Sequence, residues 1–186
     1  MFPRCGPGQT DPQTHWYDYA IMDISQITPR LFISAWPREG YAPHLRDLGI
    51  RLVISMTRVE PLSEFSEEPL LWVHVPSIDS PFTPIPLRGL KSGVSAAIPV
   101  LAAGDGVLCH CREGRHRSVA MACSILIAQG CSADAAMRLV KDKRAAADPT
   151  AFWIAPRIRK FERLWLDGWS DEIVVPPEAM EEACRR

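Results

Sequence analysis

Twelve residues between Leu108 and Val119 concentrate side chains that can do chemistry. The stretch reads LCHCREGRHRSV and holds two cysteines, two histidines and three arginines. Thiols and imidazoles bind zinc, two thiols can form a disulfide, and arginines with aromatics bind nucleic acids. A single thiol beside cationic groups can instead attack a phosphate. The spacing and the surrounding elements decide among these four chemistries.

The stretch joins a predicted strand to a predicted helix. The apolar run GVLCH (residues 106–110) predicts a short strand, and RSVAMACSILIAQG (residues 117–130) predicts a helix that is buried all round. A strand-to-helix turn points several backbone N–H groups into one concavity, and the helix dipole adds positive charge to it. Gly114 lies mid-turn, where a positive φ or a close backbone approach is needed. The turn therefore predicts an anion site.

Cys111 lies at the base of the same turn. Thiols near a helix N-terminus and cationic groups have pKa values of roughly 3.5–7.5, against about 8.5 for a free thiol. A thiolate that faces a bound phosphate is a nucleophile aimed at phosphorus. Arg117 can donate two parallel hydrogen bonds to the oxyanion, and Ser118 can donate one to the thiolate and help it leave later. The residues alone thus favour phosphoryl chemistry through one cysteine.

The rival chemistries fit the spacing less well. His110 and Cys111 are adjacent and point apart on a strand, and no Cys-x2-Cys pair stands at ligand spacing, so we expect no metal. Cys109 is either small apolar core or the partner of Cys111 in a protective disulfide, which would make peroxide inactivation reversible. The basic residues of RIRKFERLW (residues 157–165) predict a solvated helix face, so no nucleic acid partner is expected.

The remaining elements must position this turn. Apolar runs predict strands within ITPRLFISA (27–35), IRLVISMT (50–57) and LLWVHVPSIDS (70–80). Helical spacing and caps predict helices within residues 41–49, 84–104 and 133–145, and a last one that opens at 148–149 and is kinked or broken by Pro156. Strands that alternate with helices predict an α/β layered fold. The turn lies where a strand ends and a helix begins, the edge at which open α/β sheets bind ligands.

Length and composition bound the class of protein. The chain has 186 residues, 47% of them hydrophobic, and a net charge of -1. We expect a loose arm at 1–20, one domain at 21–168 and a tail at 169–186. Six cysteines at irregular spacing indicate reduced thiols and a cytoplasmic protein. No apolar run is long enough for a membrane span, and the first residues do not resemble a secretory signal.

The run HCREGRHRS has the form His-Cys-x5-Arg-Ser, the signature loop of cysteine-dependent protein tyrosine phosphatases. The chain resembles the small dual-specificity branch of that superfamily from roughly Ile27 to Trp165, including its terminal DPTAFWIAPRIRKFERLW. The resemblance implies an α/β fold with a central mixed sheet flanked by helices. It also implies hydrolysis of phosphate monoesters, with no metal or cofactor, through a cysteinyl-phosphate intermediate. The expected partner is a phosphorylated protein or another phosphomonoester; no feature indicates an oligomeric state.

Family roles carry over by position. Cys111 would be the nucleophile, Arg117 would bind phosphate and stabilise the transition state, and Ser118 would assist breakdown of the thiophosphate. His110 would tune and hold the cysteine. Asp79, in the loop VPSIDSPFTP after a strand, matches the family's general acid in order and setting. The expected phosphate-binding residues are Arg112, Glu113, Gly114, Arg115, His116 and Arg117.

The substrate is less constrained. Asp105 is the rival carboxylate to Asp79, but it begins the strand that leads to Cys111 and so belongs at the other end of the sheet. No tyrosine-recognition motif is present, which implies a shallow pocket. Arg112, Arg115 and His116 make the loop unusually cationic, as in relatives that hydrolyse phosphoinositides, inositol phosphates or RNA 5′-triphosphates. These side chains either select such a substrate or point outward. A non-catalytic phosphate-binding module and a rhodanese-like protein remain as weaker alternatives.

Overall fold

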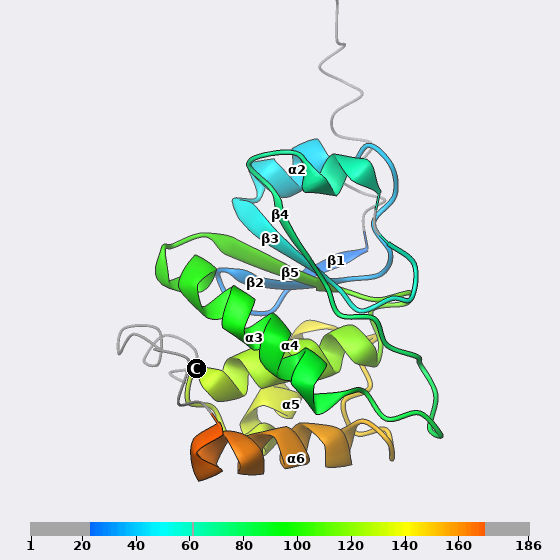
Figure 1. Ribbon diagram of the computed structural model, residues 1–186, viewed down its shortest axis with the longest axis vertical. Helices are drawn as coiled ribbons and strands as arrows, with labels where there is room; N and C mark the ends of the chain where they lie inside the picture. Colours follow the sequence, from blue (N-terminus) through cyan, green and yellow to red (C-terminus); the bar gives the residue numbers. More distant parts are fainter. Residues whose placement is uncertain (1–22, 61, 170–186) are drawn as a thin grey trace, which may run out of the picture.

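A five-stranded sheet with helices on both faces makes up the computed structural model (Figure 1), which describes residues 23–60 and 62–169. The expected arm, and the expected tail beyond Trp169, lie outside the described residues. The strands are β1 (Ile24–Gln26), β2 (Leu31–Ser34), β3 (Ile50–Ser55), β4 (Leu71–His74) and β5 (Gly106–His110). The helical elements are α2 (Ala42–Asp47), η1 (Ser63–Ser66), α3 (Leu87–Ala102), α4 (Arg117–Ala128), α5 (Ala133–Lys143), α6 (Ala155–Leu164) and η2 (Trp165–Trp169).

The sheet is mixed, with the strand order β1-β2-β5-β3-β4. β1 pairs with β2 in an antiparallel hairpin, while β5 pairs in parallel with both β2 and β3, and β3 with β4. His110 is therefore aligned with Ser34 on one side and Ser55 on the other. The predicted fold class, an α/β fold with a central mixed sheet, is confirmed. β5 occupies the middle of the sheet, so the segment after it emerges where several parallel strands end.

The two faces of the sheet are covered differently. α2 and η1 lie on one face, and α3, α4, α5 and α6 lie on the other (Figure 1). Side chains of β5 alternate between them, since Leu108 belongs to the cluster under α2 whereas Val107 and Cys109 belong to the larger core on the α4 side. This two-sided burial explains why the strand sequences are continuously apolar.

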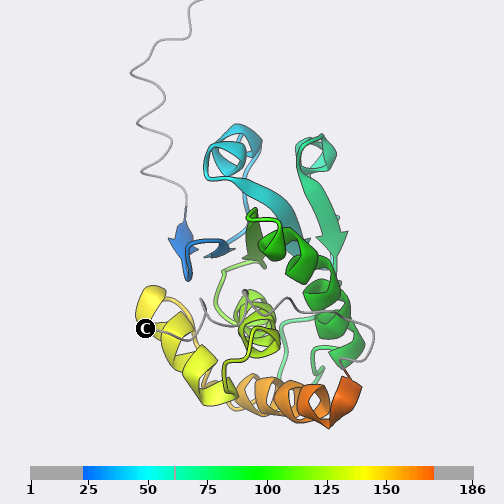
Figure 2. The same cartoon turned by 90° about the vertical axis from the view of Figure 1, so that its left-hand side faces the viewer.

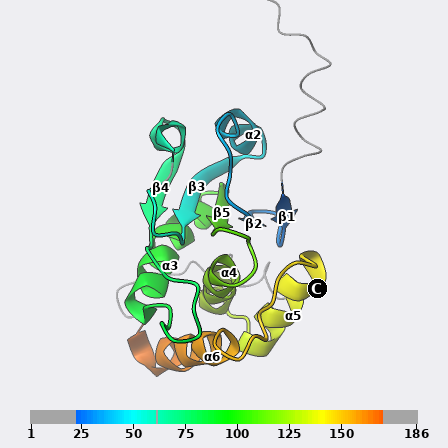
Figure 3. The same ribbon diagram turned by 90° about the vertical axis from the view of Figure 1, so that its right-hand side faces the viewer.

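α4 is the central helix of the molecule. All of its residues are buried, and α3, α5 and α6 pack around it on the side away from the sheet (Figure 2, Figure 3). A helix without a polar face is suited to this buried position and would not be stable at the surface. The N-terminus of α4 follows directly on the predicted active loop, so the deepest helix of the fold supports it.

The last helix differs from its prediction. α6 begins at Ala155 instead of 148–149, and Pro156 lies in its first turn. Residues 149–154 form turns and a bend. The prediction that Pro156 kinks or breaks the helix is wrong, because the first N–H groups of a helix have no intrahelical partner and proline loses nothing there. Among the described residues, no helix has the length and apolar character that a membrane crossing requires.

Candidate active site

The loop of residues 111–116, called the cysteine loop below, joins β5 to α4. Gly114 has φ +63° within it. A Cβ atom at Gly114 would lie 2.6 Å from the carbonyl oxygen of Ser34 and 2.5 Å from Nη2 of Arg144. Both the left-handed backbone and the close approach of two neighbours therefore require glycine here. The loop is packed from behind by β2 and by the end of α5.

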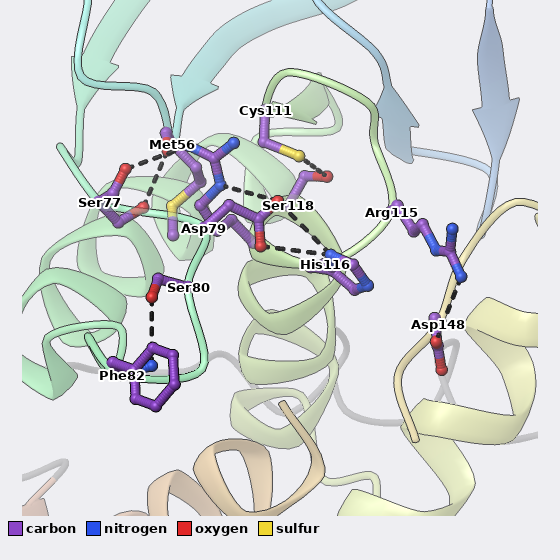
Figure 4. A network of polar contacts seen from close by, with 11 residues as sticks. Met56, Ser77, Asp79, Ser80, Phe82, Cys111, Arg115, His116, Ser118 and Asp148 are labelled. Carbon is purple, nitrogen blue, oxygen red and sulfur yellow. Dashed lines mark hydrogen bonds and ion pairs between the residues drawn. The ribbon is translucent and has the colours of Figure 1, made fainter. Parts of the chain in front are cut away.

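Cys111 lies at the base of this loop and is fully buried. Its Sγ is 3.3 Å from Oγ of Ser118 (Figure 4). Burial acts to raise the pKa of the Cys111 thiol, but hydrogen bonds from the side chain and backbone of Ser118, the charge of Arg117 and the backbone of Glu113 together lower that pKa below its ordinary value. A buried thiolate is stabilised at this position.

Arg117, the first residue of α4, is anchored by one end of its guanidinium. Nη1 donates to the carbonyl oxygens of Met56 at 3.0 Å and Ser77 at 3.1 Å. Its Nε has no hydrogen-bond partner among the described residues and lies 3.6 Å from Oδ2 of Asp79. The side chain is only 7% exposed. An arginine fixed at one end and still able to donate at the other suits a planar or tetrahedral oxyanion.

Asp79 lies in the loop between β4 and α3, called the Asp79 loop below (residues 75–86). Its side chain is 27% exposed, and its Oδ1 is 3.2 Å from Nδ1 of His116 (Figure 4). Asp79, His116 and Arg117 line the same cleft, which has a volume of about 900 Å³. Asp105 instead precedes β5, at the other end of the sheet, with its Oδ1 3.7 Å from Nε of Arg51.

His110 ends β5 beneath the cysteine loop. Its Nδ1 lies 3.5 Å from the carbonyl oxygen of Cys111, and its ring meets the edge of Trp36 at 5.9 Å between centroids. Burial is the main cause that lowers the pKa of His110 to about 4; the charges of Arg117 and His74 lower it further, against the opposing hydrogen bond to Cys111. His110 is therefore neutral near pH 7. A neutral ring can hold the Cys111 backbone without adding charge.

The other predicted phosphate-binding residues point in different directions. Arg112 and Glu113 are exposed and line the cleft. Arg115 lies outside it, with Nη2 3.6 Å from Oδ2 of Asp148 (Figure 4), and His116 turns toward Asp79. The loop thus brings Cys111, Arg117, Ser118, Asp79 and His116 to one place but leaves the Arg115 side chain on another face.

Arg144 is a site residue that the sequence did not reveal. It lies just after α5 and is 2% exposed. Its Nε donates to the carbonyl oxygen of Gly114 at 2.8 Å and its Nη2 to that of Glu113 at 3.3 Å. The far side of the guanidinium binds both carboxylate oxygens of Asp23, at 2.8 and 2.7 Å, and Oγ of Ser25. In the sequence Arg144 looks like the favourable positive end of a helix, and no local signal marks its role.

The other cysteines are not placed for catalysis. Cys109 and Cys123 are free and fully buried, and burial raises the pKa of each thiol, so both act as apolar core. Cys131 is disulfide-bonded, which corrects the expectation of reduced cysteines at this position. Within residues 23–60 and 62–169, no group of three or more His, Cys, Asp and Glu side chains is arranged to hold a metal ion.

The chain is similar to known proteins in sequence and in fold. No protein-family model matches the chain. The chain is 27% identical over 141 residues to human dual specificity phosphatase 28, a match that covers 75% of this chain and 77% of that protein. The crystal structure of human DUSP28 matches with a TM-score of 0.69 at 24% identity over 77% of this chain and 98% of that one. The structure of PTPMT1 in complex with PI(5)P matches with a TM-score of 0.68 at 21% identity, over 78% and 97% of the two chains.

The fold and the relatives lead to one assignment. The structure has a cysteine just after a central parallel strand and an arginine at the start of the following helix. The same chain is similar in sequence and in fold to dual specificity phosphatases. The chain is thus similar, in sequence and in fold, to the small dual-specificity branch of the cysteine-dependent protein tyrosine phosphatases.

Proposed function

We propose that this phosphatase hydrolyses phosphate monoesters in two steps through a cysteinyl-phosphate intermediate. The observation that carries the proposal is the thiol of Cys111, whose pKa is lowered despite its burial and whose Sγ lies 3.3 Å from Oγ of Ser118. The reaction needs no metal ion, because the thiolate supplies the nucleophile and a carboxyl group supplies the proton.

In the first step the Cys111 thiolate attacks phosphorus in line with the ester oxygen. The P–S bond forms as the P–O bond to the leaving group breaks, and Asp79 donates its proton to the departing oxygen. Arg117 and the backbone N–H groups of the cysteine loop hold the equatorial oxygens, where charge is present throughout the step. The one-ended anchoring of Arg117 on Met56 and Ser77 supports this role, since its geometry is set before substrate arrives.

In the second step water hydrolyses the thiophosphate. The Asp79 carboxylate takes a proton from water as the oxygen attacks phosphorus, the P–S bond breaks and inorganic phosphate leaves. The electron pair returns to Cys111 as a thiolate, which the hydroxyl of Ser118 stabilises by a hydrogen bond. Asp79 is then protonated again and ready for the next ester.

Two substitutions and a chelator test this chemistry. Cys111→Ser should bind vanadate or phosphate but lose turnover, and retained turnover would exclude the cysteinyl intermediate. Asp79→Asn should lower kcat by about 10²–10⁴-fold for alkyl phosphates and much less for p-nitrophenyl phosphate, whose leaving group needs no proton. Equal losses would exclude Asp79 as the acid. EDTA should leave the rate unchanged, and full inhibition would support a metal-dependent mechanism.

We propose phosphorylated protein, phosphotyrosine above all, as the substrate. Apolar side chains line or flank the cleft, among them Trp36, Val59, Ile78 and Trp153, and they suit an aromatic ester. Of the three additional basic residues in the cysteine loop, Arg115 pairs with Asp148 and His116 with Asp79, while Arg112 lines the cleft, as Arg58 does from outside the loop. Because two of the three loop cations already pair with carboxylates, we favour a single phosphate over a polyanion.

The alternative is a non-protein phosphoester. PTPMT1, a structural neighbour, was solved in complex with PI(5)P. A panel of phosphotyrosine peptide, phosphoserine peptide, phosphoinositide, inositol phosphate and RNA 5′-triphosphate, compared by kcat/KM, separates the classes. A higher kcat/KM for a polyanion than for the phosphotyrosine peptide would overturn the argument from Arg115 and His116. No turnover of any member, together with binding, would indicate a non-catalytic module.

We further propose a cytoplasmic location, because the Cys111 thiol nucleophile must stay reduced to act; the disulfide at Cys131 is the observation that speaks against this location. Imaging and fractionation of the tagged full chain would test this. Recovery from an oxidising compartment would contradict it.

A further inference from the structure

We propose that His116 is a positioning residue that holds Asp79 at the reacting centre, so that acid catalysis depends on this imidazole. The inference rests on the proposed function, because it presumes that Asp79 protonates the leaving group. The sequence places His116 among the expected phosphate-binding residues, and in the structure its ring lies against the carboxylate of Asp79 (Figure 4).

The contact is direct and involves both carboxylate oxygens. Nδ1 of His116 lies 3.2 Å from Oδ1 and 3.4 Å from Oδ2 of Asp79. The other charged neighbour, Arg117, approaches only to 3.6 Å through Nε and makes no hydrogen bond to the carboxylate. Among the described residues, His116 is therefore the one side chain within hydrogen-bond distance of the Asp79 carboxylate.

The Asp79 loop has little else to hold its tip in place. Ser77 is buried and donates to the carbonyl oxygen of Met56, but Ile78 is 42% exposed and Phe82 is 92% exposed, so the tip of the loop from Ile78 onward is not fixed by burial. Within the loop, a single bridge joins Ser80 and Thr83, and the Phe82 N–H donates to Oγ of Ser80 at 3.2 Å. Exposed loops with few buried contacts are the mobile parts of a fold.

His116 itself is held by rigid neighbours. Its side chain is 13% exposed and its ring meets Trp153 edge-on at 5.0 Å between centroids. Its carbonyl oxygen accepts from the N–H of Ala120, in the first turn of the fully buried α4. The imidazole thus connects a mobile carboxylate to the most buried helix of the molecule.

Imidazole is also suited to the chemistry of both steps. Nδ1 can accept a hydrogen bond from Asp79 when the carboxyl group is protonated, and it can donate one when the carboxylate is ionised. The contact can therefore persist while Asp79 gives up its proton and takes another from water. A simple cation would bind only the ionised form.

The test compares His116→Ala and His116→Asn with Asp79→Asn and the double variant Asp79→Asn/His116→Ala. Each is assayed with alkyl phosphates and with p-nitrophenyl phosphate. If His116 positions the acid, His116→Ala should lower kcat at least about tenfold for alkyl phosphates, with KM changed less than about twofold and p-nitrophenyl phosphate nearly unaffected. The loss should vanish in the Asp79→Asn background. His116→Asn, whose amide can donate or accept at the same place, should recover most of the rate.

Ser80→Ala is the matched control, because it removes a hydrogen bond from the same loop without touching the Asp79 carboxylate. It should keep the leaving-group dependence of the unaltered enzyme. An equal loss for every leaving group in His116→Ala, a loss that multiplies with Asp79→Asn, or the same pattern in Ser80→Ala would each overturn the inference. If Asp79→Asn itself shows no leaving-group preference, the acid assignment fails first, and the two failures are thereby distinguished.

Discussion

Replacing Arg144 by methionine should disturb the active site from behind, although residue 144 does not line the cleft. The guanidinium of Arg144 donates to the carbonyl oxygens of Gly114 and Glu113, and its other side binds Asp23 and Ser25. Methionine fills a similar volume but donates no hydrogen bond. The cysteine loop would lose the two hydrogen bonds that hold the carbonyl groups of Gly114 and Glu113.

The loss of stability in Arg144→Met can be worked out from how buried each hydrogen-bond partner of Arg144 is. Gly114 is buried, and leaving its carbonyl oxygen without a donor costs about 1–3 kcal/mol. The side chain of Asp23 is 57% exposed and can be rehydrated, so its ion pair contributes about 1 kcal/mol or less. The free energy of unfolding should therefore fall by on the order of 1–4 kcal/mol. A shift of the loop by about 1 Å would lower kcat/KM by about 10²-fold.

The assay pairs urea unfolding with kcat/KM for p-nitrophenyl phosphate. Asp23→Asn is the control, because it removes the charge at the exposed end and leaves the contacts to the cysteine loop in place; both quantities should stay near those of the unaltered protein. The reasoning is refuted if Arg144→Met keeps its stability within about 0.5 kcal/mol and its activity within about twofold.

Three further predictions follow from the same geometry. Ser118→Ala removes the leading stabilising hydrogen bond to the thiolate, so the Cys111 pKa should rise and the pH midpoint of alkylation by iodoacetamide should move upward; an unmoved midpoint contradicts this. The pKa of His110 is lowered from 6.5 to about 4, so as the pH falls the imidazole is protonated in the unfolded chain before it is protonated in the folded one. The free energy of unfolding should therefore fall by on the order of 3 kcal/mol from pH 7 to pH 4. His110→Asn should abolish this contribution to the pH dependence. Gly114→Ala should destabilise the protein more than Gly40→Ala does. Both positions have a positive φ, but only at Gly114 would the added Cβ collide with neighbouring atoms. Equal losses of stability in urea unfolding would refute the steric argument.

The cysteine loop could be predicted because its parts are adjacent in the chain. The spacing from Cys111 to Ser118, together with the change from an apolar strand to an apolar helix, is enough to predict the strand–turn–helix geometry of the loop. Asp79 could be proposed because it matches the family's general acid in its order along the chain and in its loop after a strand. The structure places Asp79 and Arg117 along the same cleft, which supports that proposal.

The contacts made across the fold could not be predicted. Arg144 is 30 residues from Gly114, and His116 is 37 residues from Asp79, so only the packing of α5 and of the Asp79 loop brings them together. Pro156 was misinterpreted for a local reason, because the sequence alone does not say which turn of a helix a proline will occupy. The first failure concerns tertiary contacts, and the second concerns the position of a proline within its own helix.

The complete burial of α4 has a consequence for how this site can be altered. Amide hydrogens of a helix with no exposed residue should exchange with solvent only when the whole domain opens, whereas those of the Asp79 loop should exchange through local fluctuations. The side of the cleft formed by the start of α4 is thus held in place by the core, whereas the side that carries Asp79 can adjust. Substitutions that adapt the enzyme to a new substrate should be tolerated in the Asp79 loop and around Val59 and Phe82, because they leave the core intact.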